Sequence, residues 1–252
     1  MTRGNTAWIL RTSAFRPPTG WLCGGSGPQL PAERAVIVMH GRSCSLDWDV
    51  HRAPFLHAAG FNVLFFDFRG HGRSPGRLVT FGCLERQDVE GAVEFLASRG
   101  IRRIGLLGFS YGGMAAMPGA LLCPEVHAVI SDGGPASLRS AITGLAVERG
   151  LPRWLGRFLG WLTVATTSLR LRANLFAYEP VRWVGKIAPR PILFIHGELD
   201  PYLSDFAELV AAAGEPKLAW RVPGVGHVKV SDTYPDEFHR RVLEFFESSL
   251  PA

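Results

Sequence analysis

Three residues, Ser110, Asp200 and His227, are of the types that nucleophilic catalysis by a hydroxyl group requires. A serine hydroxyl is a weak nucleophile near neutral pH unless a neighbouring base removes its proton as it attacks. A histidine can take that proton and later return it to the leaving group, while a carboxylate holds the imidazole in the right tautomer. The sequence therefore predicts Ser110 as nucleophile, His227 as base and Asp200 as acid.

Ser110 lies within residues 104–114, IGLLGFSYGGM, where the character of the chain changes at the serine. The apolar run before it is typical of a strand, and the small residues after it are typical of a helix. This context predicts a sharp strand-to-helix corner, which needs Gly108 and Gly112 because side chains there would clash. Such a corner lifts the hydroxyl out of the sheet and points the N-terminus of the new helix at the group under attack.

Short apolar runs alternate with amphipathic segments along most of the chain. This alternation predicts an α/β fold, a mostly parallel central sheet with helices on both faces and functional groups at the carboxyl ends of strands. Each of the three candidate residues follows a predicted strand. We expect strands at residues 6–11, 21–23, 35–39, 62–67, 104–107, 126–131, 191–195 and 218–222, and helices at residues 46–59, 84–99, 204–213 and 236–248.

The composition indicates one large globular unit. The chain has 252 residues, 47% hydrophobic and 19% charged, which suffices for a single large core. The net charge is +5, but the arginines are scattered, so we predict no nucleic-acid binding. The N-terminal apolar runs are too short for a signal peptide, which favours a cytoplasmic location. The four cysteines lack metal-ligand spacing, so we predict reduced thiols and no metal site.

The alternation stops between residues 138 and 178, where helical apolar stretches replace strands. We predict a helical cap over residues 138–178, inserted between the sixth and seventh strands of a core formed by residues 1–137 and 179–252. Trp154, Phe158 and Trp161 recur at helical spacing and can share one helix face. That face must be covered by the protein's own core or by a bound acyl chain, and in the second case the three residues bind substrate.

An uncharged stretch of twelve residues, 158–169, lies within this cap between Arg157 and Arg170. It is too short to span a bilayer, which requires about 20 residues. Two interpretations stay open. The cap packs on its own core, or its apolar face meets acyl chains or a lipid surface, with arginines toward anionic headgroups.

Five segments, taken jointly and in this order, resemble the alpha/beta hydrolase family. They are His40-Gly41, the loop at residues 67–74, the GFSYG corner, the acid loop at residues 196–200 and Gly226-His227. The likeness runs from about Ala35 to the C-terminus and is closest to small esterases and acylglycerol-lipase-like members with a helical cap. It implies hydrolysis of apolar carboxylic esters or monoacylglycerol-like substrates through an acyl-enzyme, without a cofactor. The family's dehalogenases and epoxide hydrolases carry aspartate at the corner instead of serine.

The resemblance also implies an oxyanion hole formed by the backbone N–H groups of Arg42 and Tyr111. Each such donor typically contributes about 3 kcal/mol to transition-state stabilisation. Many relatives have an aromatic or small apolar residue in place of Arg42. This change leaves the backbone N–H intact but would alter the acyl pocket if the cationic side chain pointed inward.

Alternatives remain for the acid and for the reaction. Asp132 ends the strand that follows the corner, and some lipases of similar fold place the acid there, so it is the rival of Asp200. One triad also serves thioesterases, peptidases and carbon–carbon bond hydrolases. A non-catalytic binding protein on the same fold is disfavoured because the triad and both oxyanion elements are intact.

Overall fold

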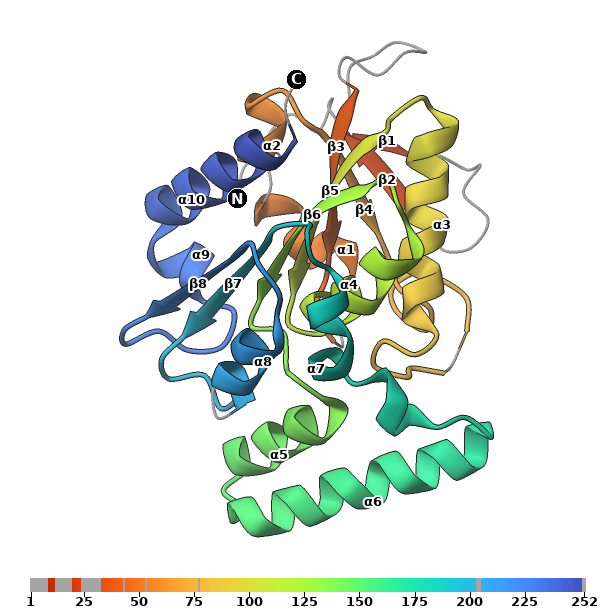
Figure 1. Cartoon of the computed structure of the whole chain (residues 1–252), viewed down its shortest axis with the longest axis vertical. Helices are drawn as coiled ribbons and strands as arrows, with labels where there is room; N and C mark the ends of the chain where they lie inside the picture. Colours follow the sequence, from red (N-terminus) through yellow and green to blue (C-terminus); the bar gives the residue numbers. More distant parts are fainter. Residues whose placement is uncertain are drawn as a thin grey trace.

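The computed structural model describes residues 9–11, 20–23, 33–42, 44–52, 54–76, 78–202 and 205–250. Within these residues a sheet of eight strands has the order β1-β2-β4-β3-β5-β6-β7-β8 (Figure 1). The first two strands pair antiparallel, and the others run parallel. The strands are β1 (Ile9–Arg11), β2 (Gly20–Cys23), β3 (Arg34–Met39), β4 (Asn62–Phe66), β5 (Arg103–Phe109), β6 (Val126–Asp132), β7 (Ile192–Gly197) and β8 (Lys217–Val222).

Helices cover both faces of this sheet, as predicted for the α/β fold (Figure 1). Residues of α3, α4 and α8 share one buried apolar cluster with the sheet, and residues of α1, α2, α9 and α10 share the other. The α-helices are α1 (Leu46–Asp49), α2 (Pro54–Ala58), α3 (Glu85–Ser98), α4 (Tyr111–Leu122), α5 (Leu138–Glu148), α6 (Arg153–Leu171), α7 (Pro180–Trp183), α8 (Phe206–Ala212), α9 (Val230–Thr233) and α10 (Pro235–Ser249).

The central strands are apolar runs because both of their faces are buried. In β3, Ile37 and Met39 pack in the cluster with α3 and α4, while Val36 and Val38 pack in the cluster with α10. Successive side chains of a strand point to opposite faces, so a strand covered on both sides needs apolar residues throughout. This layering confirms the predicted fold class.

The predicted helix at residues 46–59 was wrong as one continuous element. The structure has α1, a 3₁₀ turn at Val50–Arg52 and then α2, which begins at Pro54. Proline lacks the backbone N–H that an uninterrupted helix needs, but it fits the first position of a new helix. The predicted strands at residues 6–11 and 21–23 are present as the antiparallel pair β1 and β2, and residues 6–8 lie outside the described residues.

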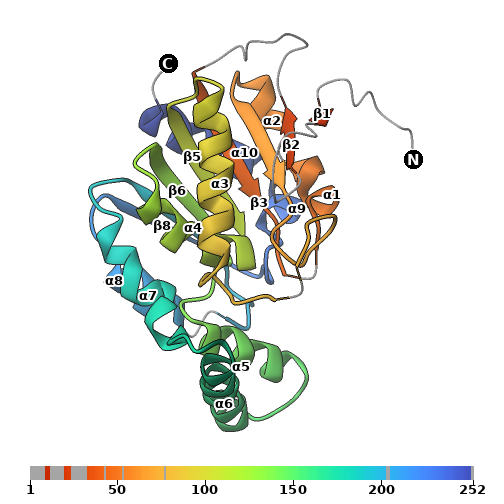
Figure 2. The same cartoon turned by 90° about the vertical axis from the view of Figure 1, so that its right-hand side faces the viewer.

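Two helices, α5 and α6, lie beyond the carboxyl ends of the strands, between β6 and β7 in the chain (Figure 2). The buried residues of α6 are Gly156, Gly160 and Val164. A side chain at Gly160 would come within 2.8 Å of the Arg139 carbonyl oxygen in α5, so the absent side chain permits close helix packing. The division into a core and a cap of residues 138–178 stays a prediction.

Candidate active site

The corner at Ser110 joins β5 directly to α4. Ser110 has φ 51° and ψ −111°, a backbone conformation that L-residues adopt only under strain. A side chain at Gly108 would collide with the backbone of Gly112, and one at Gly112 would collide with the Met39 carbonyl. The Ser110 N–H donates to the Asp132 carbonyl oxygen at 2.7 Å, which ties the corner to β6. The glycines are therefore required by the close approach of three chain segments.

Ser110, His227 and Asp200 form a continuous hydrogen-bonded chain. Ser110 Oγ lies 2.7 Å from His227 Nε2, and His227 Nδ1 lies 2.7 Å from Asp200 Oδ2. The buried Asp200 carboxylate accepts a hydrogen bond from the His227 Nδ1–H, and this tautomer leaves Nε2 free to accept the serine proton. The structure thus brings together all three residues that the sequence predicts as the triad, in the geometry of nucleophile, base and orienting acid.

Asp200 is held in turn by its own loop. The Tyr202 N–H donates to Asp200 Oδ1 at 2.9 Å, and the Tyr202 ring packs edge-on against His227 at 4.6 Å. A side chain at Gly144 in α5 would collide with the Tyr202 ring, so Tyr202 also packs against α5. Sequence analysis did not single out Tyr202, because an aromatic residue two positions after the acid is not a motif.

Asp132, the rival acid, is fully buried beside the triad. Neither of its carboxyl oxygens has a hydrogen-bond partner among the described residues. Burial raises the pKa of Asp132 to about 8, with a further contribution from the negative charge of Asp200. The structure places Asp200, and not Asp132, against His227.

Two backbone segments lie beside Ser110 where the oxyanion donors are predicted. Tyr111 is the first residue of α4, so its N–H has no partner within the helix. The loop after β3 passes close to Ser110. A Cβ atom at Gly41 would lie 3.7 Å from Ser110 Cβ. Arg42 follows in this loop, and its side chain is exposed. The oxyanion role of Arg42 and Tyr111 stays a prediction.

His40 braces the loop after β3. The Phe68 N–H donates to His40 Nε2 at 3.1 Å, so Nδ1 carries the proton and donates to the Gly41 carbonyl oxygen at 2.7 Å. Burial lowers the pKa of His40 to about 4, which keeps the ring neutral near neutral pH. A neutral, doubly bonded imidazole is suited to holding a loop, and not to proton transfer.

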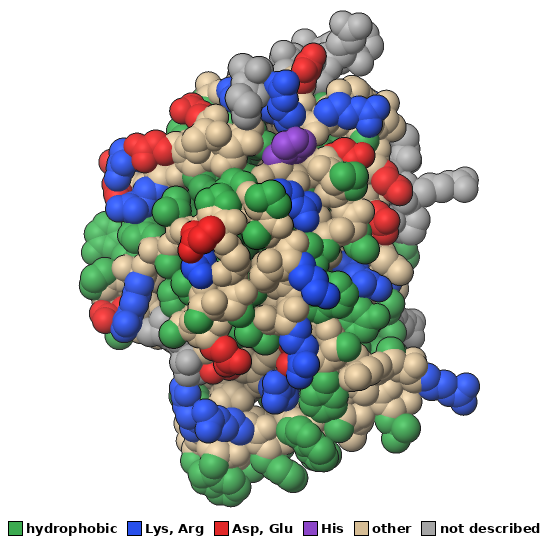
Figure 3. Space-filling model, viewed as in Figure 1, with side chains coloured by type: hydrophobic (Ala, Val, Ile, Leu, Met, Phe, Trp, Pro, Cys, Tyr) green, Lys and Arg blue, Asp and Glu red, His purple; other side chains and the backbone are tan. Residues whose placement is uncertain are grey.

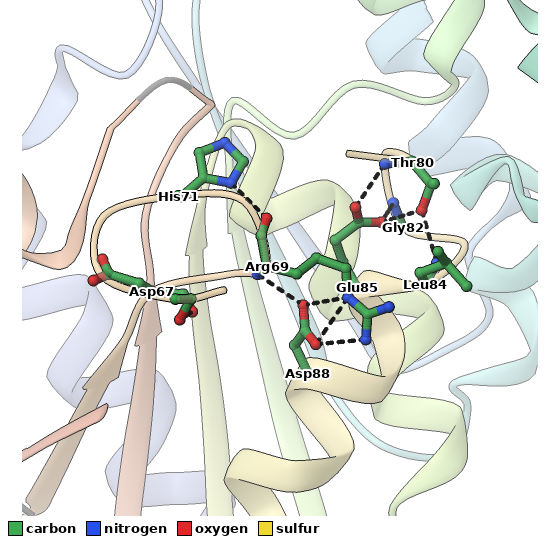
Figure 4. Close-up of polar contacts among 9 residues, drawn as sticks. Asp67, Arg69, His71, Thr80, Gly82, Leu84, Glu85 and Asp88 are labelled. Atoms are coloured by element: carbon green, nitrogen blue, oxygen red, sulfur yellow. Dashed lines mark hydrogen bonds and ion pairs between the residues drawn. The ribbon is translucent and has the colours of Figure 1, made fainter. Parts of the chain in front are cut away.

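Two further acids, Asp88 and Glu85 of α3, hold the loops that contain Arg69 and Thr80 (Figure 4). Both loops contact the Tyr111 ring, through His71 and Phe81. Asp88 binds the Arg69 guanidinium, with a closest distance of 2.7 Å. Glu85 is fully buried and accepts hydrogen bonds from Thr80 N at 2.6 Å, Thr80 Oγ1 at 2.6 Å and Gly82 N at 2.8 Å. Sequence analysis missed Glu85 as a site residue. The sequence did offer one signal: Glu85 is a charged residue on the same face of its helix as the apolar residues.

Comparison with known proteins identifies the family. A sequence model of the alpha/beta hydrolase family matches residues 36–241. The chain belongs to the alpha/beta hydrolase family. An uncharacterised protein of Mycobacterium tuberculosis is 34% identical to this hydrolase over 209 residues, which cover 81% of the chain and 64% of the relative.

Solved structures agree with this assignment. The Pyrococcus furiosus esterase Pf2001 superposes with a TM-score of 0.71 and 26% identity, over 92% of this hydrolase and 87% of the esterase. The monoacylglycerol lipase of Paleococcus ferrophilus has a TM-score of 0.65 at 17% identity, over 96% and 99% of the two chains. The latter likeness shows the fold alone.

Ser110 of this hydrolase lies on the walls of two pockets. One, of about 240 Å³, is mostly apolar and extends toward α5 and α6, and its lining includes Val79, Phe81, Leu138, Ile142, Leu145 and Leu175. The other, of about 520 Å³, is lined by apolar residues such as Trp48, Phe109 and Leu145 and also by the charged side chains of Asp49, Arg52, Glu148, Lys229 and Asp232. Arg42 lines both pockets. A substrate at Ser110 therefore meets apolar groups on both sides, with most of the charged side chains in the larger pocket.

The three aromatic residues predicted for the substrate site lie elsewhere. Trp154, Phe158 and Trp161 do share a face of α6, but they are 70%, 54% and 53% exposed. None of them lines the apolar pocket at Ser110, to which α6 contributes Thr163 and Thr167. The reason is that α6 packs on α5 through Gly156 and Gly160, which turns the aromatic face away from the pocket.

Proposed function

We propose that this hydrolase cleaves carboxylic esters with an apolar acyl or alcohol group through an acyl-enzyme on Ser110. One observation carries the proposal: the hydrogen-bonded chain of Ser110, His227 and Asp200 ends on the wall of an apolar pocket of about 240 Å³. The likeness to an esterase of known structure supports it.

The reaction follows from the positions of these groups. Ser110 Oγ attacks the ester carbonyl carbon while its proton passes to His227 Nε2. The N–H groups of Tyr111 and Arg42 stabilise the oxyanion of the tetrahedral intermediate. The intermediate collapses to an acyl-serine as the alcohol leaves with the proton from His227. A water molecule then gives a proton to His227 and attacks the acyl carbon, which releases the acid and restores Ser110.

The apolar pocket favours substrates with an alkyl chain. Each buried methylene contributes about 0.8 kcal/mol, so affinity should rise with chain length until the pocket is filled. The charged side chains of the larger pocket suit the hydroxyl groups of a monoacylglycerol-like substrate. Thioesters are the main competing substrates, because the same triad and pocket would accept them.

The test is turnover of p-nitrophenyl acetate, butyrate and octanoate, with matched acyl thioesters measured in parallel. We expect a burst of p-nitrophenol, labelling by a fluorophosphonate probe, and loss of both in Ser110→Ala while the protein stays folded. Persistent labelling at another serine would contradict the nucleophile. A much larger kcat/KM for thioesters than for the matched esters would replace the ester assignment with a thioesterase.

A further inference from the structure

The outer face of α6 is an exposed apolar surface. This outer face consists of the side chains of Trp154, Phe158, Trp161, Leu162 and Leu169, which are 70%, 54%, 53%, 40% and 82% exposed. Residues spaced in this way along a helix lie on one side of it. These five large apolar side chains are exposed to water on one helix face. Exposed apolar patches of this kind mark interaction sites.

The position of α6 leaves this outer face accessible. In Figures 1 and 2, α6 is the outermost element of the molecule, with α5 between it and the sheet. Its opposite side, with Gly156, Gly160 and Val164, is buried. Figure 3 shows hydrophobic side chains gathered along this end of the molecule, with basic side chains beside them.

The charges that α6 and its flanking residues carry have one sign. Residues 149–178 contain five arginines and no aspartate or glutamate. Arg153 and Arg157 lie near one end of α6, and Arg170 and Arg172 lie at the other. Within the described residues, none of these four forms an ion pair with a carboxylate. An apolar stripe between cationic groups is complementary to a layer that has an apolar interior and anionic groups at its surface.

We propose that the outer face of α6 docks on an anionic lipid bilayer, with α6 lying in the plane of the interface. Amphipathic helices bind in this way by burying aromatic and leucine side chains at the acyl boundary while arginines contact anionic headgroups. No helix within the described residues is long and apolar enough to cross a membrane, so the contact is peripheral. Thr163 of α6 is exposed and lines the apolar pocket, so the pocket opens beside the docked helix.

A second copy of the chain fits this surface less well than lipid. Pairing two outer faces would bring the arginine groups of one α6 against those of the other, and like charges in contact are destabilising. An anionic bilayer satisfies both the apolar stripe and the arginines. The docking proposal does not depend on the esterase assignment, because it concerns binding and not turnover.

The experiment is co-sedimentation with vesicles of phosphatidylcholine alone or mixed with phosphatidylglycerol, using the full chain and Ser110→Ala. We expect binding to the mixed vesicles that weakens at least tenfold in high salt, because surface electrostatics are screened. The combined variant Trp154→Ser, Phe158→Ser, Trp161→Ser should lose binding at least tenfold. Leu218→Ser is the matched control, since Leu218 is 59% exposed but lies on β8.

Three outcomes would overturn the proposal: no binding of the unaltered chain to mixed vesicles, equal binding of the triple variant, or a dimer seen by sedimentation velocity that the triple variant abolishes. Hydrolysis of p-nitrophenyl acetate in solution reports whether the triple variant is folded. If it is not, Leu169→Gln alone, at the most exposed position, takes its place and should weaken binding without changing acetate turnover. Vesicle binding by Ser110→Ala separates failure of docking from failure of the esterase assignment.

Discussion

The loops around Ser110 are held by buried polar side chains, whereas α6 is held by close contacts of small residues. His40, Asp67, Glu85 and Asp88 each accept a hydrogen bond from a backbone N–H of a loop near the corner. In α6 the buried residues are two glycines and a valine. Directional bonds determine where each atom of the corner lies. Small-residue packing determines only which side of α6 faces inward and leaves its outer side to the solvent or to a partner.

Asp200→Asn should have the largest effect on catalysis. The amide would leave His227 in the wrong tautomer, so kcat should fall by about 10⁴-fold, while KM changes little because the pockets are unaltered. Steady-state hydrolysis of p-nitrophenyl butyrate measures both constants.

Asp132→Asn is the matched control for this substitution, since its carboxyl lies beside the triad without bonding His227. It should keep kcat within about tenfold of the unaltered enzyme. If Asp132→Asn loses activity while Asp200→Asn keeps it, Asp132 and not Asp200 is the acid of the triad.

Glu85→Gln should have an intermediate effect that depends on substrate length. The amide group would face donors at Thr80 or Gly82, and each buried unsatisfied group costs about 1–3 kcal/mol. Phe81 lies between these residues, has φ 53° and lines the apolar pocket. We expect kcat/KM to fall about tenfold for octanoate and less for acetate, with a lower Tm. Glu94→Gln, on the exposed side of the same helix, is the control, and an equal loss for both esters would exclude a role in shaping the pocket.

Much of the fold and the triad could be predicted because they follow from local sequence. Ser110, Asp200 and His227 come directly after strands, and parallel strands bring their carboxyl ends to one edge of the sheet. Glu85 and Tyr202 could not be predicted in their roles because their partners come from tertiary contacts. The direction in which the aromatic face of α6 points could not be predicted either. Periodicity shows which residues share a face, but not which of two faces a neighbouring helix will cover.

The stability of the protein should depend on the ionisation of Asp132. Its pKa of about 8 in the folded protein lies above the ordinary value of 3.8. Between these values the folded state holds a proton that the unfolded state has lost, so stability falls as pH rises through this window. Asp132→Asn removes the ionisation, and its Tm relative to the unaltered protein should therefore increase from pH 5 to pH 8 and level off above. The exposed Asp236→Asn serves as control, and a Tm difference that is constant with pH would contradict the burial effect.

Trp161→Ala should have the smallest effect on the hydrolysis of soluble esters. Trp161 is 53% exposed and lines a cavity between Arg139, Arg157 and Glu208, separate from the apolar pocket at Ser110. Its removal should leave the profile of kcat/KM across acetate, butyrate and octanoate parallel to that of the unaltered enzyme. Partial burial of the ring predicts a modest decrease in Tm.

Thr167→Trp tests the opposite side of α6, the side that lines the apolar pocket, for comparison with the aromatic outer face. Thr167 lines the apolar pocket, so a large ring there should remove space for the acyl chain and lower kcat/KM for octanoate much more than for acetate. The two variants together decide which face of α6 meets the substrate. If Trp161→Ala, and not Thr167→Trp, changes the dependence on chain length, the acyl chain lies along the aromatic face. That face would then bind the substrate. The explanation that the glycine contacts turn it away from the substrate would be wrong.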